Sequence, residues 1–110
     1  MKPLLIDEDR LEQLRKRLEH VNRAYARSLG TKADGLAQAM EDWQSGDGTA
    51  RQRLGEGLHR LASAGSFGFP DITELAVPLE KKLIDGVNPS TLIAEIDEFI
   101  AHIRARSGSL

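Results

Sequence analysis

Among the side chains able to do chemistry, His59 stands out because the residues around it are small. On a helix its neighbours one turn before and after are Gly55, Ala62 and Ser63. Small neighbours leave an imidazole open to the surface of another macromolecule. Near neutral pH the ring is largely uncharged, and one nitrogen then has a free lone pair that can attack an acyl phosphate and later return the phosphoryl group. The sequence therefore predicts that His59 is a phosphate-accepting nucleophile.

Other chemistries are excluded or weakly supported. The chain has no cysteine, which excludes disulfides, thiolate metal sites and thiol catalysis. His20, His59 and His102 are far apart and form no i, i+4 pair, so no metal site is expected. An isolated exposed histidine on a helix is usually only solvated, and we expect this of His20 and His102, which lie off the apolar stripes. We expect the same of four charged residues: Glu74, Glu80, Lys81 and Lys82.

The elements that must position His59 are helices. Apolar residues recur at helical spacing, and no stretch alternates as a strand would. The pattern predicts five helices, at about 9–29, 32–44, 49–64, from 70 up to 86, and from 88 past 103. Expected stops are Gly30, Gly46, Gly65 and Gly86, and Pro70 and Pro89 suit helix first turns. Residues 1–6 are expected to form an N-terminal extension, and residues 106–110 a frayed tail or linker.

Each predicted helix carries one narrow apolar stripe, which should face a common core. Narrow stripes and short connections favour an antiparallel bundle of the first, third, fourth and fifth helices, with the second packed across it or extending it. Cap pairs are expected at Asp9 with Glu12 and at Thr49 with Gln52. The stripes are Leu11, Leu14, Leu18, Val21 and Tyr25; Ala33, Leu36, Met40 and Trp43; Leu54, Leu58, Leu61 and Gly65; Ile72, Leu75, Leu79 and Leu83; and Leu92, Ile96, Phe99 and Ile103.

On a helical wheel His59 lies roughly 130° from the centre of its helix's apolar arc, so its ring should reach solvent. Gly55 and Gly57 each cost roughly 0.5–1 kcal/mol inside a helix, which we interpret as room left for a partner at the ring. Arg53 and Arg60 could supply positive charge, although the wheel places both well round from His59. The expected docking surface consists of Gln52, Gly55, Glu56, Arg60, Ala62 and Ser63.

The length and composition are those of an ordinary globular protein and predict a single domain spanning residues 1–110. Hydrophobic residues make up 40% of the chain, and 15 basic against 17 acidic side chains give a net charge of −2. This balance gives no general attraction to nucleic acid or to an anionic membrane. No apolar run approaches the ~20 residues needed to span a bilayer, and residues 1–6 are too short for a signal-peptide core. We therefore expect a cytoplasmic protein without membrane insertion.

The run from Leu58 to Pro70, with Leu79-Glu80 downstream, resembles the histidine-containing phosphotransfer (HPt) domains of bacterial two-component phosphorelays. The resemblance implies an all-α fold, an antiparallel four-helix bundle with an additional short helix. It also implies reversible phosphorylation of His59 by the phospho-aspartate of a receiver domain, with Mg²⁺ supplied by that receiver and no cofactor bound by this chain. Such a domain is a phosphocarrier in signal transduction, not an enzyme. The implied partners are a response-regulator receiver domain, a hybrid sensor histidine kinase, or both.

The chain departs from the family pattern in two respects, the small residues that follow the histidine and a proline in the next helix. Ser63 stands where the family has glycine four residues after the histidine, and Gly68 follows His59 by nine residues instead of ten. Pro78 lies inside a predicted helix and removes one of its hydrogen bonds. Two other hypotheses therefore stay open. One is a degenerate HPt module that binds a receiver or kinase domain without accepting phosphate. The other is a small enzyme using His59 as a general base, which needs a concave pocket beside the ring and a second titratable group within hydrogen-bond reach.

Overall fold

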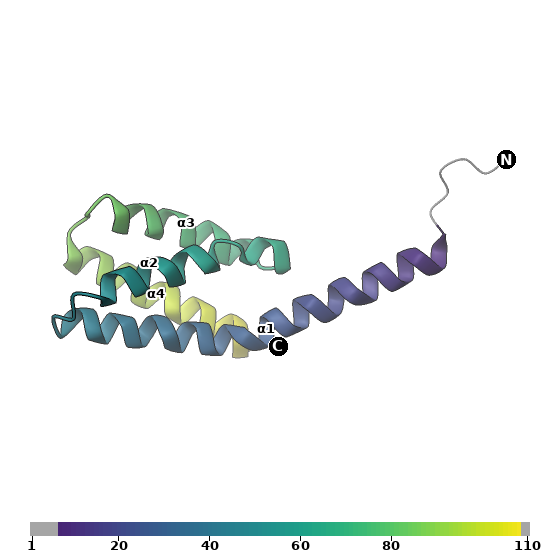
Figure 1. The fold of residues 1–110 in the computed structure, drawn as a ribbon, viewed down its shortest axis with the longest axis horizontal. Helices are drawn as coiled ribbons and strands as arrows, with labels where there is room; N and C mark the ends of the chain where they lie inside the picture. Colours follow the sequence, from purple (N-terminus) through teal and green to yellow (C-terminus); the bar gives the residue numbers. More distant parts are fainter. Residues whose placement is uncertain (1–6, 109–110) are drawn as a thin grey trace.

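The computed structural model describes residues 7–108, and this part of the chain is all-helical, as predicted. It contains four α-helices and one short 3-10 helix (Figure 1), with no strand among the described residues. Residues 1–6 of the predicted extension, and 109–110 of the predicted tail, lie outside the described residues. The elements are α1 (Glu8–Gln44), α2 (Ala50–Leu61), η1 (Ala64–Phe67), α3 (Pro70–Ile84) and α4 (Pro89–Gly108).

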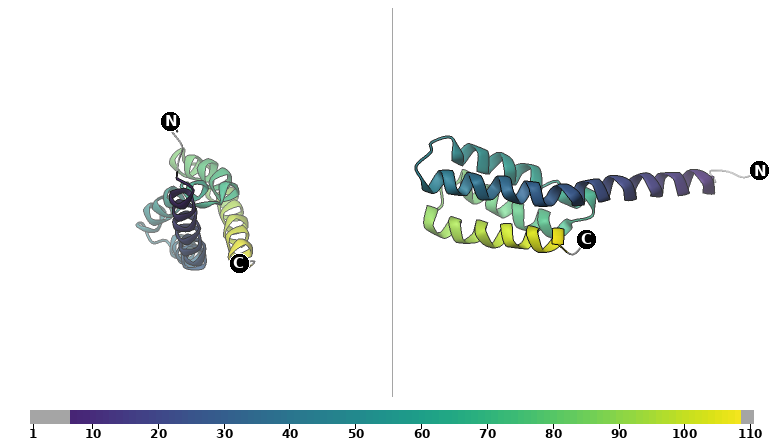
Figure 2. Two further views of the ribbon diagram at one scale, coloured as in Figure 1. Left: turned by 90° about the vertical axis from the view of Figure 1, so that its right-hand side faces the viewer. Right: turned by 90° about the horizontal axis from the view of Figure 1, so that it is seen from below.

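The helices surround one apolar core. Helix α1 packs against α2 and α4, and α3 packs against the same two helices. Figures 1 and 2 show this arrangement from different sides. Aliphatic side chains fill the space between them, since burying each contributes roughly 1.5–3 kcal/mol relative to leaving it exposed. The largest fully buried side chains are Leu29, Leu54, Leu58, Leu61, Ile72, Leu92, Ile96 and Ile103.

The first two predicted helices are one helix of 37 residues, so the expected stop at Gly30 is wrong. A glycine ends a helix by adopting positive φ, and the glycines that do so here are Gly46, Gly68 and Gly86. The cost of a helical glycine at Gly30 is offset because Leu29 and Ala33 on either side are completely buried. The predicted ends at Gly46 and Gly86 are confirmed, and the second predicted helix extends the first.

The N-terminal part of α1 projects beyond the bundle (Figures 1 and 2), so much of its predicted core stripe is exposed. We call residues 8–21 the α1 arm. The arm explains why the radius of gyration is 17.8 Å, where about 13 Å is usual for a chain of this length. The stripe residues exposed in the arm are Leu11, Leu14, Leu18 and Val21.

Helix α3 buries a slightly different face from the predicted one. Leu75 is 41% exposed, whereas Ala76 is fully buried between Ile72 and Leu79. Steps of three and four residues are both compatible with a helical stripe, so spacing alone could not distinguish Leu75 from Ala76. The start of α3 at Pro70 is confirmed, as is the inward face of α4.

An aspartate before the predicted position caps α1, and another aspartate binds the residue that precedes α2. Asp7 accepts a hydrogen bond from the backbone N–H of Asp9, so the Asp9–Glu12 cap pair is wrong. Asp47 accepts from both the backbone N–H and the hydroxyl of Thr49, which leaves Thr49 unable to form the predicted capping box. The backbone hydrogen bond from Thr49, followed by that of its hydroxyl, lowers the pKa of Asp47 below its ordinary value.

The end of α2 also differs from the prediction. The helix stops at Leu61, and Gly65 lies inside η1 instead of ending a helix. The backbone N–H of Gly65 donates to Thr73 Oγ1 at 2.7 Å, which ties this turn to α3. Gly68 then takes φ +92° and directs the chain into α3.

The tail predicted to fray is helical through Gly108. Arg106 lies 4.9 Å from the ring centre of Phe69 and 3.2 Å from Asp71, and these contacts hold the last turn of α4 against the bundle. Tyr25 stacks on Phe67 with ring centroids 4.4 Å apart, which fixes η1 against α1 where the arm leaves the bundle.

The two glycines in α2 should respond oppositely to alanine. A Cβ at Gly55 would meet Leu83 Cδ2 at an ordinary 3.6 Å, whereas one at Gly57 would lie 2.8 Å from Cδ2 of the buried Leu36. Gly55→Ala should therefore stabilise the fold by roughly 0.5–1 kcal/mol through helix propensity. Gly57→Ala should be at least about 1 kcal/mol less stable than Gly55→Ala, because overpacking outweighs the same gain. Urea unfolding of both variants measures the difference, and equal stabilisation would contradict the close approach of α2 to α1.

Candidate functional site

His59 lies on the outer face of α2, with 77% of its side chain exposed. Leu58, the residue before it, is completely buried, and Leu54 and Leu61 are at most 1% exposed. These leucines fix the rotation of α2 about its axis, and the residue after Leu58 must then point toward the edge of the bundle. The ring reaches solvent as the helical wheel predicts.

The imidazole is oriented by a carboxylate from the neighbouring helix. Nδ1 of His59 lies 3.0 Å from Oε1 of Glu80 on α3, whose side chain is 22% exposed. A carboxylate is only an acceptor when ionised, so the geometry assigns the proton of the neutral ring to Nδ1. Nε2 then carries the lone pair, at the solvent-facing end of the ring. The arrangement provides a nucleophilic nitrogen and a counter-charge for the ring if it becomes cationic.

The expectation that Glu80 is only a solvated surface side chain is therefore wrong. Its Leu-Glu pair belongs to the motif that carries the family resemblance, and that was the available signal. Periodicity within a single helix could not show the contact, because the histidine and the carboxylate lie 21 positions apart on different helices. The small-enzyme hypothesis needs a second titratable group within reach of the ring, and Glu80 meets that requirement.

An open groove borders the ring between α2 and α3. Four of the six predicted docking residues line it, namely Gln52, Gly55, Glu56 and Arg60. The structure does not place Ala62 and Ser63 among the lining residues. Ala62 packs against the core, and the hydroxyl of Ser63 donates to the carbonyl oxygen of Arg60 at 2.7 Å.

Ile84 completes the groove and was not predicted. Its side chain is 73% exposed, one helical turn after Glu80. A large exposed aliphatic side chain at the rim of a groove offers an apolar contact surface. The only indication of this exposure in the sequence is that Ile84 follows Leu83 and so lies just off the buried stripe of α3.

The arginines and glycines near His59 have separate roles. Arg53 pairs with Asp42 and Asp47 at 2.9 and 3.1 Å and so braces the turn between α1 and α2. Arg60, by contrast, lines the groove. Gly55 also faces the groove, whereas Gly57 allows α2 to approach Leu36, so our interpretation of Gly57 as room beside the ring is wrong.

His102 forms a second histidine–carboxylate pair, and the expectation that it is merely solvated is wrong. Its Nε2 lies 2.6 Å from Oδ2 of Asp71, which Arg106 also contacts. Burial raises the pKa of Asp71, but the hydrogen bond from His102 and the charge of Arg106 outweigh it, so the pKa lies below its ordinary value. His20 is exposed as expected.

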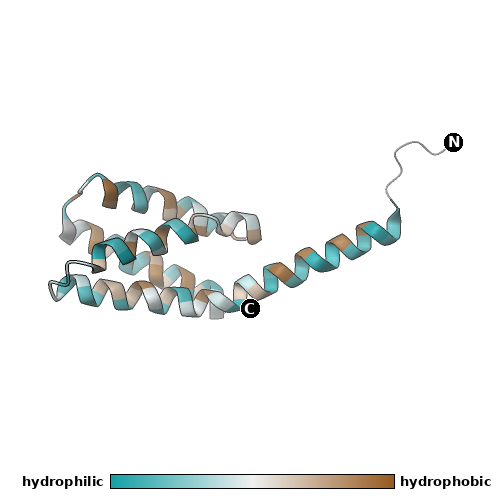
Figure 3. Cartoon of the chain, viewed as in Figure 1, coloured by the Kyte–Doolittle hydropathy of each residue, from teal (hydrophilic) through white to brown (hydrophobic). Residues whose placement is uncertain are grey.

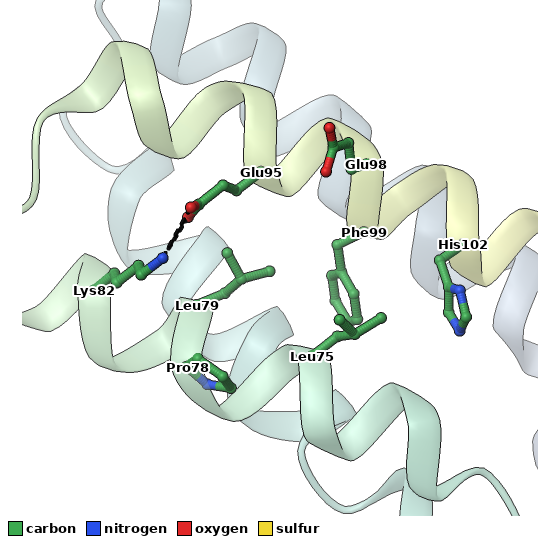
Figure 4. A pocket seen from close by; sticks show the side chains of 8 residues that line it. All are labelled: Leu75, Pro78, Leu79, Lys82, Glu95, Glu98, Phe99 and His102. Carbon is green, nitrogen blue, oxygen red and sulfur yellow. Dashed lines mark hydrogen bonds and ion pairs between the residues drawn. The ribbon is translucent and has the colours of Figure 1, made fainter.

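A second groove lies between α3 and α4, next to His102 (Figure 4). Leu75, Pro78 and Phe99 line its middle, and Lys82 and Glu95 form an ion pair of 2.8 Å at its other end. Lys82 is therefore not simply a solvated side chain. Glu74 and Lys81 are exposed as expected.

Residues 7–108 contain no group of three or more histidine, cysteine, aspartate or glutamate side chains that could hold a metal ion. Within the same range no helix is long and apolar enough to cross a membrane. Compared with known proteins, the chain matches no family model, no curated protein and no solved structure.

Asp71 should make stability depend on pH in the acid range. Because its folded-state pKa is lowered, its contribution is fully present above the ordinary value of about 3.9 and is lost as pH falls through the folded value. Asp71→Asn should thus lower the free energy of unfolding at pH 6, with a difference from wild type that shrinks below about pH 4. Denaturant unfolding from pH 2.5 to 6 measures this, with Asp97→Asn, an exposed carboxylate on the same bundle, as control. Parallel pH curves for wild type and Asp71→Asn would contradict the prediction.

Proposed function

We propose that this chain is a histidine phosphotransfer domain that accepts a phosphoryl group on Nε2 of His59 from a receiver-domain aspartate and relays it in two-component signalling. The observation that carries the proposal is the hydrogen bond between Nδ1 of His59 and Glu80, because it leaves the exposed Nε2 as the nucleophile. Under this proposal the protein is a cytoplasmic phosphocarrier, and the receiver supplies Mg²⁺.

The proposal includes a finer description of the fold, an antiparallel four-helix bundle with η1 as its additional short helix. Short connections between α1, α2, α3 and α4 support it, since neighbours joined by short loops usually run antiparallel. The packing of α1 and α3 against the same two helices is also typical of such a bundle.

The phosphoryl transfer balances with the groups present. The Nε2 lone pair attacks phosphorus in line with the aspartyl oxygen, the N–P bond forms, and the P–O bond breaks with its electron pair leaving as the receiver's carboxylate. The ring becomes a phospho-imidazolium that still carries its Nδ1 proton, and Glu80 stabilises that positive charge. The cationic ring is also the better leaving group when the phosphoryl group passes on, so one carboxylate assists both directions.

The groove favours a macromolecular donor over a small substrate. The ring is 77% exposed, whereas sites for small molecules usually enclose most of the ligand. Ile84 at the rim supplies apolar contact, and Glu56 and Arg60 supply opposite charges for orientation. Such a mixed surface suits the fast and weak encounters that a relay requires.

Phosphotransfer should require His59 and neither of the other histidines. Receiver domains are charged with radiolabelled acetyl phosphate and Mg²⁺, then mixed with wild type, His59→Gln, His20→Gln or His102→Gln. We expect label on every protein except His59→Gln, with the acid lability and base stability of a phosphohistidine. An established HPt domain serves as positive control. Label retained by His59→Gln would refute the assignment of the acceptor.

The same experiment separates the carrier from a non-phosphorylated interaction module. The shortened spacing to Gly68 and the end of α2 at Leu61 favour that alternative, because they alter the turn that follows the histidine. Receivers that bind the wild-type chain and label the control domain, but never label this chain, would establish the module instead.

Glu80 and Ile84 should affect different kinetic quantities. Glu80→Gln removes the charge that stabilises the phosphorylated ring and should slow transfer about tenfold at saturating receiver, which corresponds to roughly 1.4 kcal/mol. Ile84→Ala removes only docking contact, and should raise the half-saturating receiver concentration about fivefold without changing the saturated rate. Rapid-quench transfer at several receiver concentrations tests both. A saturated rate that is unchanged in Glu80→Gln would mean that the carboxylate plays no part in transfer.

A further inference from the structure

The α1 arm carries an apolar seam that no other described residue covers. Leu11, Leu14, Leu18 and Val21 are 47, 52, 62 and 45% exposed. Figure 3 shows brown, hydrophobic bands along the projecting helix. Their spacing of three, four and three residues is the heptad spacing of a coiled coil, in which each side chain packs between residues of a second helix. The spacing therefore indicates a helix as the occupant of this seam.

The charges beside the seam indicate what kind of helix fits. On a wheel, the charged residues within about 90° of the centre of the seam are Arg10, Arg15 and Arg17. Glu8 lies one heptad before Arg15 on the same edge, and Glu12, further round, pairs with the Arg15 guanidinium at 2.7 Å. Arg10 and Arg17 also line a shallow hollow with Leu14. A helix packed on the seam would therefore meet two arginines, Arg10 and Arg17, along one edge, whereas Glu12 already compensates Arg15 on the other edge.

A second copy of the chain fits this seam poorly. A parallel pair would place Arg10 opposite the partner's Arg15, and an antiparallel pair with Leu14 against Leu18 would place two copies of Arg17 opposite one another. An anionic membrane fits less well too, since membrane-surface helices have a broad apolar face, and this seam has two apolar positions per heptad.

We infer that the α1 arm is a docking site for an amphipathic helix of another protein, with apolar residues at heptad spacing and acidic residues on the flank that faces Arg10 and Arg17. The pairing forms a short two-stranded coiled coil in which the partner's carboxylates meet these two arginines. The arm shares no residue with the groove around His59, so this interaction is independent of phosphotransfer.

The probe is a 21-residue fluorescent peptide with Ile at a, Leu at d and Glu at e and g, matched with a peptide that has Lys at e and g. Fluorescence anisotropy with the full chain should show the acidic peptide binding at least about tenfold more tightly than the basic one. The preference should shrink as salt rises from 0.05 to about 0.5 M, because the flanking charges are exposed. Equal binding of both peptides, or binding of neither, would overturn the inference.

Two variants test the seam and its flanks separately. The double variant Leu14→Gln and Leu18→Gln should lose binding while the thermal unfolding midpoint stays unchanged, because both side chains are exposed outside the core. The double variant Arg10→Glu and Arg17→Glu should reverse the preference to the basic peptide. Loss of binding with a lowered unfolding midpoint, or an unchanged preference in the charge variant, would contradict the assignment.

Two further measurements test the rejected occupants. Sedimentation equilibrium at tens of micromolar should show a monomer; a dimer that the Leu14 and Leu18 double variant abolishes would overturn the inference in favour of a second copy. Vesicles of phosphatidylglycerol and phosphatidylcholine should not bind the chain, and binding that depends on the two leucines would favour a membrane surface instead.

Discussion

The close packing of α2 between α1 and α3 determines what the rest of the molecule can do. Gly57 has no side chain, so α2 can approach Leu36 of α1, and the buried Leu58 fixes the helix in one rotation. With that rotation fixed, His59 falls at the edge facing α3, within hydrogen-bond distance of Glu80. A different rotation of α2 would separate the imidazole from its carboxylate and would expose the leucines that hold the helix in the core.

The two histidine–carboxylate pairs show why geometry matters more than residue type. His59 uses Nδ1 for its carboxylate and leaves Nε2, the nitrogen further from the backbone, toward solvent. His102 uses Nε2 for Asp71, so its remaining nitrogen is the one close to the backbone, and its side chain is only 36% exposed. Arg106 also contacts Asp71 and compensates its charge. The same two functional groups thus leave an exposed ring with a free nitrogen in one place and connect two helices in the other.

Sequence patterns predicted several features that depend on one helix, although not the helix caps or the absence of a stop at Gly30, and missed those that depend on two. The exposure of His59 follows from the leucines on its own helix, and helix ends at Gly46 and Gly86 follow from local backbone geometry. The pairing with Glu80 and the exposure of Ile84 at the groove require the placement of α3 beside α2, which no local pattern contains. The sequence likewise could not distinguish the roles of Gly55 and Gly57, because the close contact of Gly57 with Leu36 depends on the packing of α2 against α1.

The α1 arm shows a different limit of sequence reasoning. An apolar stripe indicates that one face of a helix is covered, but it does not indicate which surface covers that face. Leu29 and Ala33 satisfy the stripe inside the bundle, whereas Leu11 to Val21 continue it where no other part of residues 7–108 covers it. Exposing a contiguous row of leucines costs solubility and favours aggregation, so its presence in one regular seam needs a physical reason. Arginines beside the seam supply both a solvated edge when the arm is alone and a selective contact when an acidic helix binds.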